Sequence, residues 1–351
     1  MTFDVALILL VDGLANGAVY LLAGLGLVLI FSVTRVVFVP FGDIAAFAAL
    51  SLAAFETGQR PATIAMVGCL AALVLVVELA GCLRRGEAQR MPRVLLAWGV
   101  LPALPCLFAW WVAGAGAPVA LKIVAAVLLV VPLGPLVARL ALQPIADASV
   151  LVLLIVSLAL HFLLSGMGLL FFGPEGMRTS ALVGGNLELA GGLSVSGQVL
   201  LMVGSAIALS VLFFLAFERT TPGKALRATA VNRVGARLVG IRPARTALTA
   251  YIVASVLGGL IGVLVAPSMT MYYDSGFLIG LKAFVAAIIG GLTSYPLTAA
   301  GALAVGIVES FGSFWSGALK DVIVFSLLIP VLLLRSALAA HPEEEQEEVD
   351  E

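Results

Sequence analysis

Charged residues are scarce in this sequence. Only 11% of its 351 residues are Asp, Glu, Lys or Arg, whereas 62% are hydrophobic. A soluble globular chain has about a quarter charged residues. The mean hydropathy is +1.17. This composition excludes a soluble enzyme, a disordered protein and a nucleic-acid-binding protein, and it predicts a polytopic membrane protein.

Histidine and cysteine are also scarce, with two His and three Cys residues in the chain. His161 lies inside an apolar run and has no acidic or cysteine neighbour in the sequence. The cysteines show neither metal-ligand nor disulfide spacing, and no His, Asp or Ser cluster has catalytic spacing. We therefore expect no catalytic residue, no metal ion and no cofactor bound by this chain.

Long apolar runs, by contrast, are abundant. A spanning helix needs about 20 mainly apolar residues. The sequence therefore predicts an all-α polytopic membrane protein with about 11 transmembrane helices, formed by a single domain over residues 1–337. The runs are 7–31, 38–56, 62–82, 94–113, 118–139, 149–172, 197–217, 246–266, 277–291, 297–314 and 319–337. Of these, 277–291 is short enough to be a broken or tilted helix.

The basic residues are unevenly distributed along the chain. Seven of the 20 acidic residues lie in the tail 338–351, which leaves 13 acidic against 19 basic residues elsewhere. Lys and Arg gather near 84–93 and in 218–245, as they do in cytoplasmic loops. An odd number of spans then places the N-terminus outside and the C-terminus in the cytoplasm. We expect a disordered acidic tail and an irregular external cap over 173–196.

The basic loop 218–245 has the strongest local signals. Thr221 is a candidate N-cap with Pro222 at the first helical position, and Asn232 can cap a second short helix that ends at Gly240. Two short helices with small side chains would form a hairpin that another protein can approach closely. A basic loop that only contacts lipid headgroups is an equally open interpretation.

Several blocks of sequence stand in order along the chain: Gly13-Leu14-Ala15-Asn16-Gly17-Ala18-Val19-Tyr20, Gly223 to Ala230, Gly280 to Gly291, Gly306-Ile307-Val308-Glu309 and Lys320-Asp321-Val322. Taken together, they resemble those of LivH-type permease subunits of branched-chain amino acid ABC transporters. The resemblance covers residues 7–56 and about 118–337, while 57–117 holds two spans more than the usual permease. In that inserted segment, Glu78 is expected to extend toward the headgroups or to pair with Arg84.

The resemblance implies a subunit of an importer in the bacterial inner membrane that forms part of the pore for an amino acid or a related small organic solute. Its expected partners are a related or identical second permease, two cytoplasmic ATP-binding subunits that use ATP, a periplasmic solute-binding protein and the lipid bilayer, with no nucleic acid. The chain itself is then not an enzyme. The loop 218–245 becomes the ATPase-coupling element through Gly223, Arg227, Ala230, Asn232, Ala236 and Gly240.

Polar and ionisable residues inside spans are costly and usually functional. Two structural alternatives stay open: an ion pair between Lys282 and Glu309, and hydrogen bonds from Asp12 and Asn16, one helical turn apart, to a neighbouring helix. The expected solute path comprises Asp12, Asn16, Tyr20, Phe38, Phe41, Asp43, Lys282 and Glu309.

The segment after the first span departs from the family pattern. Where family members usually carry Asn-Phe-Ala-His-Gly-Glu, this chain has Phe38 in place of Asn and Phe41 in place of His. Two aromatic rings favour an apolar, branched-chain or aromatic solute, and packing of both rings against other helices is the alternative. An ion-coupled secondary transporter is the rival function, but it predicts an internal repeat and a relay of buried acids or histidines.

Overall fold

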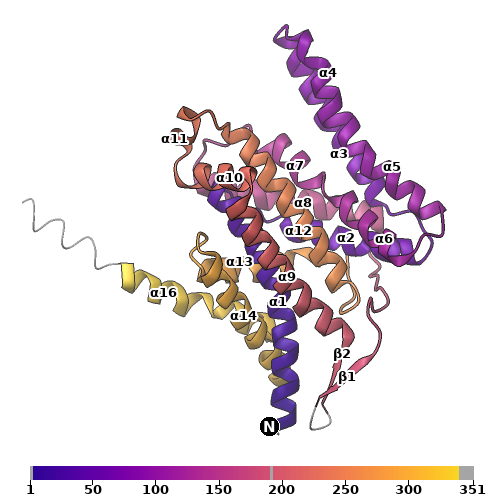
Figure 1. The fold of residues 1–351 in the computed structure, drawn as a ribbon, viewed down its shortest axis with the longest axis vertical. Helices are drawn as coiled ribbons and strands as arrows, with labels where there is room; N and C mark the ends of the chain where they lie inside the picture. The colour runs from indigo at the N-terminus through magenta and orange to yellow at the C-terminus, as the bar shows by residue number, and fades with distance from the viewer. Residues whose placement is uncertain (1–2, 190–192, 340–351) are drawn as a thin grey trace, which may run out of the picture.

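The computed structural model describes residues 3–189 and 193–339, so the acidic tail from residue 340 onward lies outside the described residues. The chain folds into an elongated helical bundle with one small β-hairpin at its end (Figure 1). The prediction of an all-α polytopic membrane protein is confirmed.

The helices follow one another along the whole chain. They are α1 (Phe3–Thr34), α2 (Phe41–Glu56), α3 (Thr63–Arg84), α4 (Met91–Val94), α5 (Leu101–Gly114), α6 (Val119–Val130), α7 (Leu133–Val137), α8 (Val150–Phe172), α9 (Gly197–Arg219), α10 (Thr221–Val231), α11 (Arg233–Leu238), α12 (Pro243–Val265), α13 (Gly276–Ile289), α14 (Tyr295–Trp315), α15 (Lys320–Ser326) and α16 (Leu328–Ala339). The strands are β1 (Asn186–Leu189) and β2 (Leu193–Ser196). Helices occupy each of the eleven predicted runs.

Within the described residues, eight helical stretches are long and apolar enough to cross a membrane. Two of them contain a π-helical segment: Leu95–Val100 links α4 to α5, and Ala138–Leu142 extends α7. The eight are Asp4–Thr34, Thr63–Arg84, Ala88–Gly114, Val119–Leu142, Val150–Phe172, Gly197–Arg219, Pro243–Val265 and Tyr295–Trp315.

Helices α2 and α13 are shorter than a full span. They have 16 and 14 residues, and at 1.5 Å per residue neither covers a hydrocarbon core of about 30 Å. All 15 residues from Phe41 to Phe55 in α2 are buried. Because protein rather than lipid surrounds α2, its ends need not reach the membrane surfaces.

Glycine allows the backbones around α2 to touch. A Cβ atom on Gly42 would lie 1.9 Å from the carbonyl oxygen of Gly276 in α13. A Cβ atom on Gly262 in α12 would lie 2.0 Å from the carbonyl oxygen of Ala45. Only glycine fits at such distances, and small residues serve the same purpose between other membrane helices.

The two ends of the bundle differ in charge. The start of α1 and the β-hairpin lie at one end, and α10, α11 and the turn between α3 and α4 lie at the other (Figure 1). The basic segments 84–93 and 218–245 thus share one end, opposite the N-terminus, as the charge argument requires. We refer to this end as the basic end.

The stretch 173–196 is more regular than predicted. It contains the antiparallel hairpin of β1 and β2, in which Asn186 pairs with Ser196 and Leu187 with Val195. The sequences Asn-Leu-Glu-Leu and Leu-Ser-Val-Ser alternate polar and apolar residues with the period of a strand. Their shortness and the glycines between them obscured this pattern.

The basic loop folds into the predicted helical hairpin, with one correction. The N-cap of α10 is Thr220 rather than Thr221, and its hydroxyl accepts a hydrogen bond from the Gly223 amide at 3.2 Å. Asn232 caps α11 as predicted, and its side chain accepts from the next turn at 3.0 and 2.9 Å. Gly240 then turns the chain with a φ of +85°.

The first prediction concerns which side of the membrane each end faces. In a cysteine-free background, a cysteine at Glu188, which is exposed in β1, should react with an impermeant maleimide added to intact cells. A cysteine at Gln89, exposed at the basic end, should react only after permeabilisation. Labelling of the Gln89 position in intact cells would contradict the orientation.

A second prediction tests the glycine contacts. Gly42→Ala should lower the unfolding midpoint in detergent, because overpacking costs about 1–3 kcal/mol even after the helix gains from losing a glycine. Gly68→Ala is the matched control, since a Cβ on this α3 glycine meets no atom within 4 Å. Equal midpoints for both variants would show that α2 and α13 are not in backbone contact.

Candidate solute cavity

A cavity of about 280 Å³ lies between helices α1, α9, α12, α13, α14 and α15. One part of its wall is charged or polar and the other is apolar. Its polar lining is Asn16, Tyr20, Ser268, Ser275, Lys282, Glu309, Lys320 and Asp321, and its apolar lining is Val19, Met202, Val265, Met269, Leu278 and Ile279. Such a wall suits a small solute that has both a charged and an apolar end.

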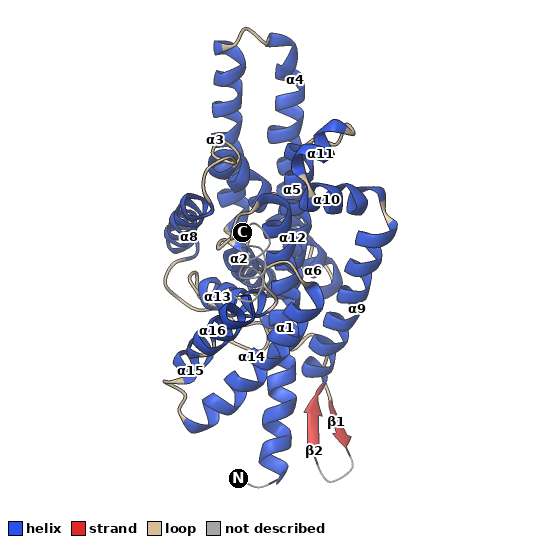
Figure 2. Cartoon of the chain, turned by 90° about the vertical axis from the view of Figure 1, so that its left-hand side faces the viewer, coloured by secondary structure: helices blue, strands red, loops and turns tan. Residues whose placement is uncertain are grey.

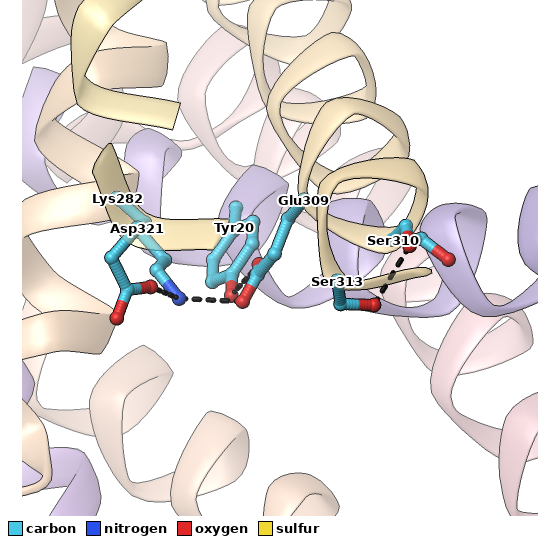
Figure 3. Close-up of polar contacts among 6 residues, drawn as sticks. All are labelled: Tyr20, Lys282, Glu309, Ser310, Ser313 and Asp321. Carbon is cyan, nitrogen blue, oxygen red and sulfur yellow. Dashed lines mark hydrogen bonds and ion pairs between the residues drawn. The ribbon is translucent and has the colours of Figure 1, made fainter. Parts of the chain in front are cut away.

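The charged part of the wall is a buried cluster (Figure 3). The ammonium of Lys282 lies 2.5 Å from Glu309 Oε1 and 2.8 Å from Asp321 Oδ1. The Tyr20 hydroxyl donates a hydrogen bond of 2.5 Å to Glu309 Oε2. Lys282 and Glu309 are 5% and 7% exposed. One ammonium thus faces two carboxylates, and the cluster joins α1, α13, α14 and α15.

The structure brings together half of the sequence-predicted solute path. Asn16, Tyr20, Lys282 and Glu309 all line the cavity. The predicted alternative of an ion pair between Lys282 and Glu309 is also realised, so the same groups hold helices together and face the cavity. Asp321 was missed, although its block Lys320-Asp321-Val322 carries part of the family resemblance.

Asp12 and the residues at the start of α2 lie away from the cavity lining. Asp12 is exposed. The Phe38 ring meets the Tyr251 ring edge-on, with centroids 5.1 Å apart. The Phe41 ring packs on Gly26, where a Cβ atom would lie 2.5 Å from the ring. Both phenylalanines are buried in helix packing, the alternative left open by the sequence, and neither contacts the cavity.

Asp43 has a partner that sequence reasoning missed. Nδ1 of His161 in α8 lies 2.9 and 2.8 Å from the two carboxylate oxygens of Asp43. The His161 ring also stacks on Phe277 of α13, with centroids 4.6 Å apart. His161 was set aside because no acid is near it in the sequence, but Asp43 is 118 residues away. Treating any ionisable residue in an apolar run as a candidate would have identified it.

Glu78 also pairs differently from the prediction. Its two carboxylate oxygens accept hydrogen bonds of 2.8 Å from Nε and Nη2 of Arg139, and not from Arg84. A planar guanidinium matches a carboxylate in this two-bond geometry. Within residues 3–189 and 193–339, no group of three or more His, Cys, Asp or Glu side chains is placed to hold a metal ion.

The predicted coupling residues lie at the basic end. Gly223 packs under α9, where a Cβ atom would lie 2.4 Å from the carbonyl oxygen of Ala216. Arg227 approaches Glu218 at 3.4 Å. Ala236 is buried and Ala230 is half-buried. The same hairpin exposes large apolar side chains to solvent, namely Val231, Val234, Leu238 and Val239, which are 67–83% exposed.

Apolar helices packed around a small cavity that has a buried ion pair in its wall are features of a membrane permease. Residues 9–332 match the family described as the branched-chain amino acid transport system, permease component. The chain belongs to this family of permeases, and it is a multi-pass protein of the inner membrane.

The chain is similar to several characterised relatives. It is 28% identical to the high-affinity branched-chain amino acid transport system permease protein LivH of Escherichia coli (strain K12) over 237 residues, which are 65% of this chain and 76% of that protein. It is 30% identical to the corresponding permease BraD of Pseudomonas aeruginosa over 219 residues, which are 59% and 70% of the two chains. No solved structure matches the chain.

A third prediction concerns the buried charge cluster. Lys282→Met would leave the buried Glu309 carboxylate and the half-buried Asp321 carboxylate without their counter-ion, and breaking a buried pair costs about 3–5 kcal/mol. Glu309→Gln should cost less, about 1–2 kcal/mol, because Lys282 keeps Asp321 and Tyr20 keeps an acceptor. Equilibrium unfolding in mixed micelles measures both values. A smaller loss for Lys282→Met than for Glu309→Gln would contradict this account.

Proposed function

We propose that this chain forms part of the pore of an ATP-driven importer for an amino acid or a closely related organic solute with an apolar side chain. The observation that carries the proposal is the two-sided lining of the cavity. Asn16, Tyr20 and the Lys282 cluster offer hydrogen bonds and charges to the polar end of such a solute. Met202, Met269 and the other apolar residues of the wall fit its side chain.

The names of the similar permeases support a solute with an apolar side chain. LivH and BraD are named as permeases of high-affinity branched-chain amino acid transport. A branched aliphatic side chain fits the apolar wall, while urea and other strongly polar solutes would leave it unused. The preference for an apolar solute thus rests on the cavity wall, and the buried Phe38 and Phe41 rings contribute to it only through helix packing.

The proposed complex has further subunits. A second permease, related or identical, completes the pore, two cytoplasmic ATP-binding subunits hydrolyse ATP, and a periplasmic solute-binding protein delivers the solute. The apolar tip of the α10–α11 hairpin supports this arrangement. Val234 and Leu238 are 67% and 83% exposed at the basic end, and large apolar side chains in an aqueous region usually mark a protein interface.

The α10–α11 hairpin is also packed firmly enough against α9 to pass on a movement of a bound subunit. Gly223 holds the start of α10 against the end of α9, and Thr220 and Asn232 cap the two short helices. We assign the hairpin as the coupling element that moves with the ATP-binding subunits. Its movement would shift the spans between outward-facing and inward-facing states as packed units.

A fourth prediction tests the solute cavity. Met269→Trp adds bulk to a cavity of about 280 Å³, so it should reduce leucine uptake about tenfold relative to alanine uptake in vesicles that contain the whole transporter. Leu170→Trp is the control, because this α8 side chain is 79% exposed and lies outside the cavity lining. An unchanged leucine-to-alanine ratio in Met269→Trp would contradict a solute path through this cavity.

A fifth prediction tests the coupling element. Leu238→Glu places a charge on an exposed apolar residue, so the subunit should fold while solute uptake falls tenfold or more, about the effect of removing an interface anchor. ATP hydrolysis should no longer respond to the solute-loaded binding protein. Gln89→Glu adds the same charge at the same end but outside the hairpin, and should leave uptake unchanged. Normal coupled uptake with Leu238→Glu would remove the hairpin from the mechanism.

A further inference from the structure

A second hollow, outside the solute cavity, lies in the helical pair α3 and α4–α5. This pair reaches beyond the rest of the bundle at the basic end (Figure 2). Between its two arms is a groove of about 710 Å³. Five arginines line it, together with two glutamates: Arg84, Arg85, Arg90, Arg93, Arg139, Glu78 and Glu87. We call this feature the arginine groove.

The two carboxylates of the groove are each already paired with an arginine. Glu78 holds Arg139 through two hydrogen bonds of 2.8 Å, and Glu87 holds Arg90 at 2.8 Å. Arg84, Arg85 and Arg93 form no ion pair or hydrogen bond with any described side chain. Three guanidinium groups therefore face one groove without a counter-charge, and their mutual repulsion favours an anion between them.

The walls of the groove below the arginines are apolar. Val77, Ala80, Val94, Ala97 and Trp98 line it. The outer faces of the same helices expose further large apolar residues, which are Val76, Leu83, Leu95, Leu96 and Val100 at 45–67% exposure. In a spanning protein this surface faces lipid tails, and a Trp beside arginines is typical of headgroup depth. A free inorganic anion would use the arginines but not these walls.

We propose that the arginine groove binds an anionic phospholipid, whose phosphate is held by Arg84, Arg85 and Arg93 while its acyl chains lie along α3 and α5. Guanidinium groups pair with phosphate oxygens through two parallel hydrogen bonds. Basic pockets between helices at the cytoplasmic surface suit headgroups that carry phosphates. The pair Glu78–Arg139 and the Trp98 ring form the fixed floor of the groove, because Arg139 lies 6.0 Å from that ring.

The test is native mass spectrometry of the delipidated full-length chain, titrated with phosphatidylglycerol or cardiolipin and, separately, with phosphatidylcholine. We expect the anionic lipids to bind in preference to phosphatidylcholine. The triple variant Arg84→Gln, Arg85→Gln, Arg93→Gln should bind the anionic lipids about 100-fold more weakly. The matched control changes three exposed arginines of the α9–α12 segment at the same end, Arg219→Gln, Arg237→Gln and Arg242→Gln, and should keep the affinity.

A milder variant covers the case in which the triple Gln variant does not fold. Arg84→Lys, Arg85→Lys, Arg93→Lys keeps the charge but loses the paired hydrogen bonds, so it should bind the lipids with intermediate affinity. Equal binding by the wild-type chain and either groove variant would overturn the proposal.

Two further outcomes would also overturn it, each by identifying another occupant. Complete displacement of the lipids by millimolar inorganic phosphate, with the same affinity for the groove arginines, would make the site one for a free anion. Alternatively, lipid binding that required deletion of residues 340–351 would make the acidic tail the occupant.

Discussion

The close contact of helix backbones around α2 determines how the central helices can pack. Gly42 meets Gly276 of α13, and Ala45 meets Gly262 of α12, at distances that leave no room for a side chain. With α2 enclosed in this way, a 16-residue helix can sit at membrane depth without spanning it. The same contacts set the position of α13, which carries Lys282 toward α14 and Phe277 toward α8.

Buried charges are then tolerated because each one has a partner from a different helix. Asp43 in α2 receives His161 from α8, and Lys282 in α13 receives Glu309 from α14. The first pair relates to the departure from the family pattern in this segment. Phe41 stands where the resembled family usually has histidine, and the His161 imidazole of α8 lies beside the acid Asp43 instead. Breaking either pair would leave an uncompensated charge in a low-dielectric interior, which is far more costly than the pair itself.

Local signals in the sequence predicted the local features of the fold. Apolar runs located the helices, Asn232 and Gly240 marked the ends of α11, and the clustering of arginines predicted a basic end. The sequence did not reveal which distant residues meet. The partner of Glu78 is Arg139 rather than the nearer Arg84, because the packing of α3 on α7 brings the two together. The lining of the cavity was predicted only in part for the same reason. Family blocks identified Lys282 and Glu309, whereas the role of Asp321 depends on the turn that begins α15.

Helix α1 gives the proposed function a physical link between solute and ATP. Its middle turns carry Asn16 and Tyr20 to the cavity. Its last turn carries Ser32, followed by Arg35, to a second hollow of about 550 Å³ between α9, α10 and α14, lined also by Phe213, Phe217 and Tyr295. Arg35 ends the helix with a φ of +62°, a conformation that is costly for a residue with a side chain. In the proposed mechanism, a movement of α10 would act directly on the end of α1. A continuous 32-residue helix would then transmit it to Tyr20 and the Lys282 cluster without any intervening loop.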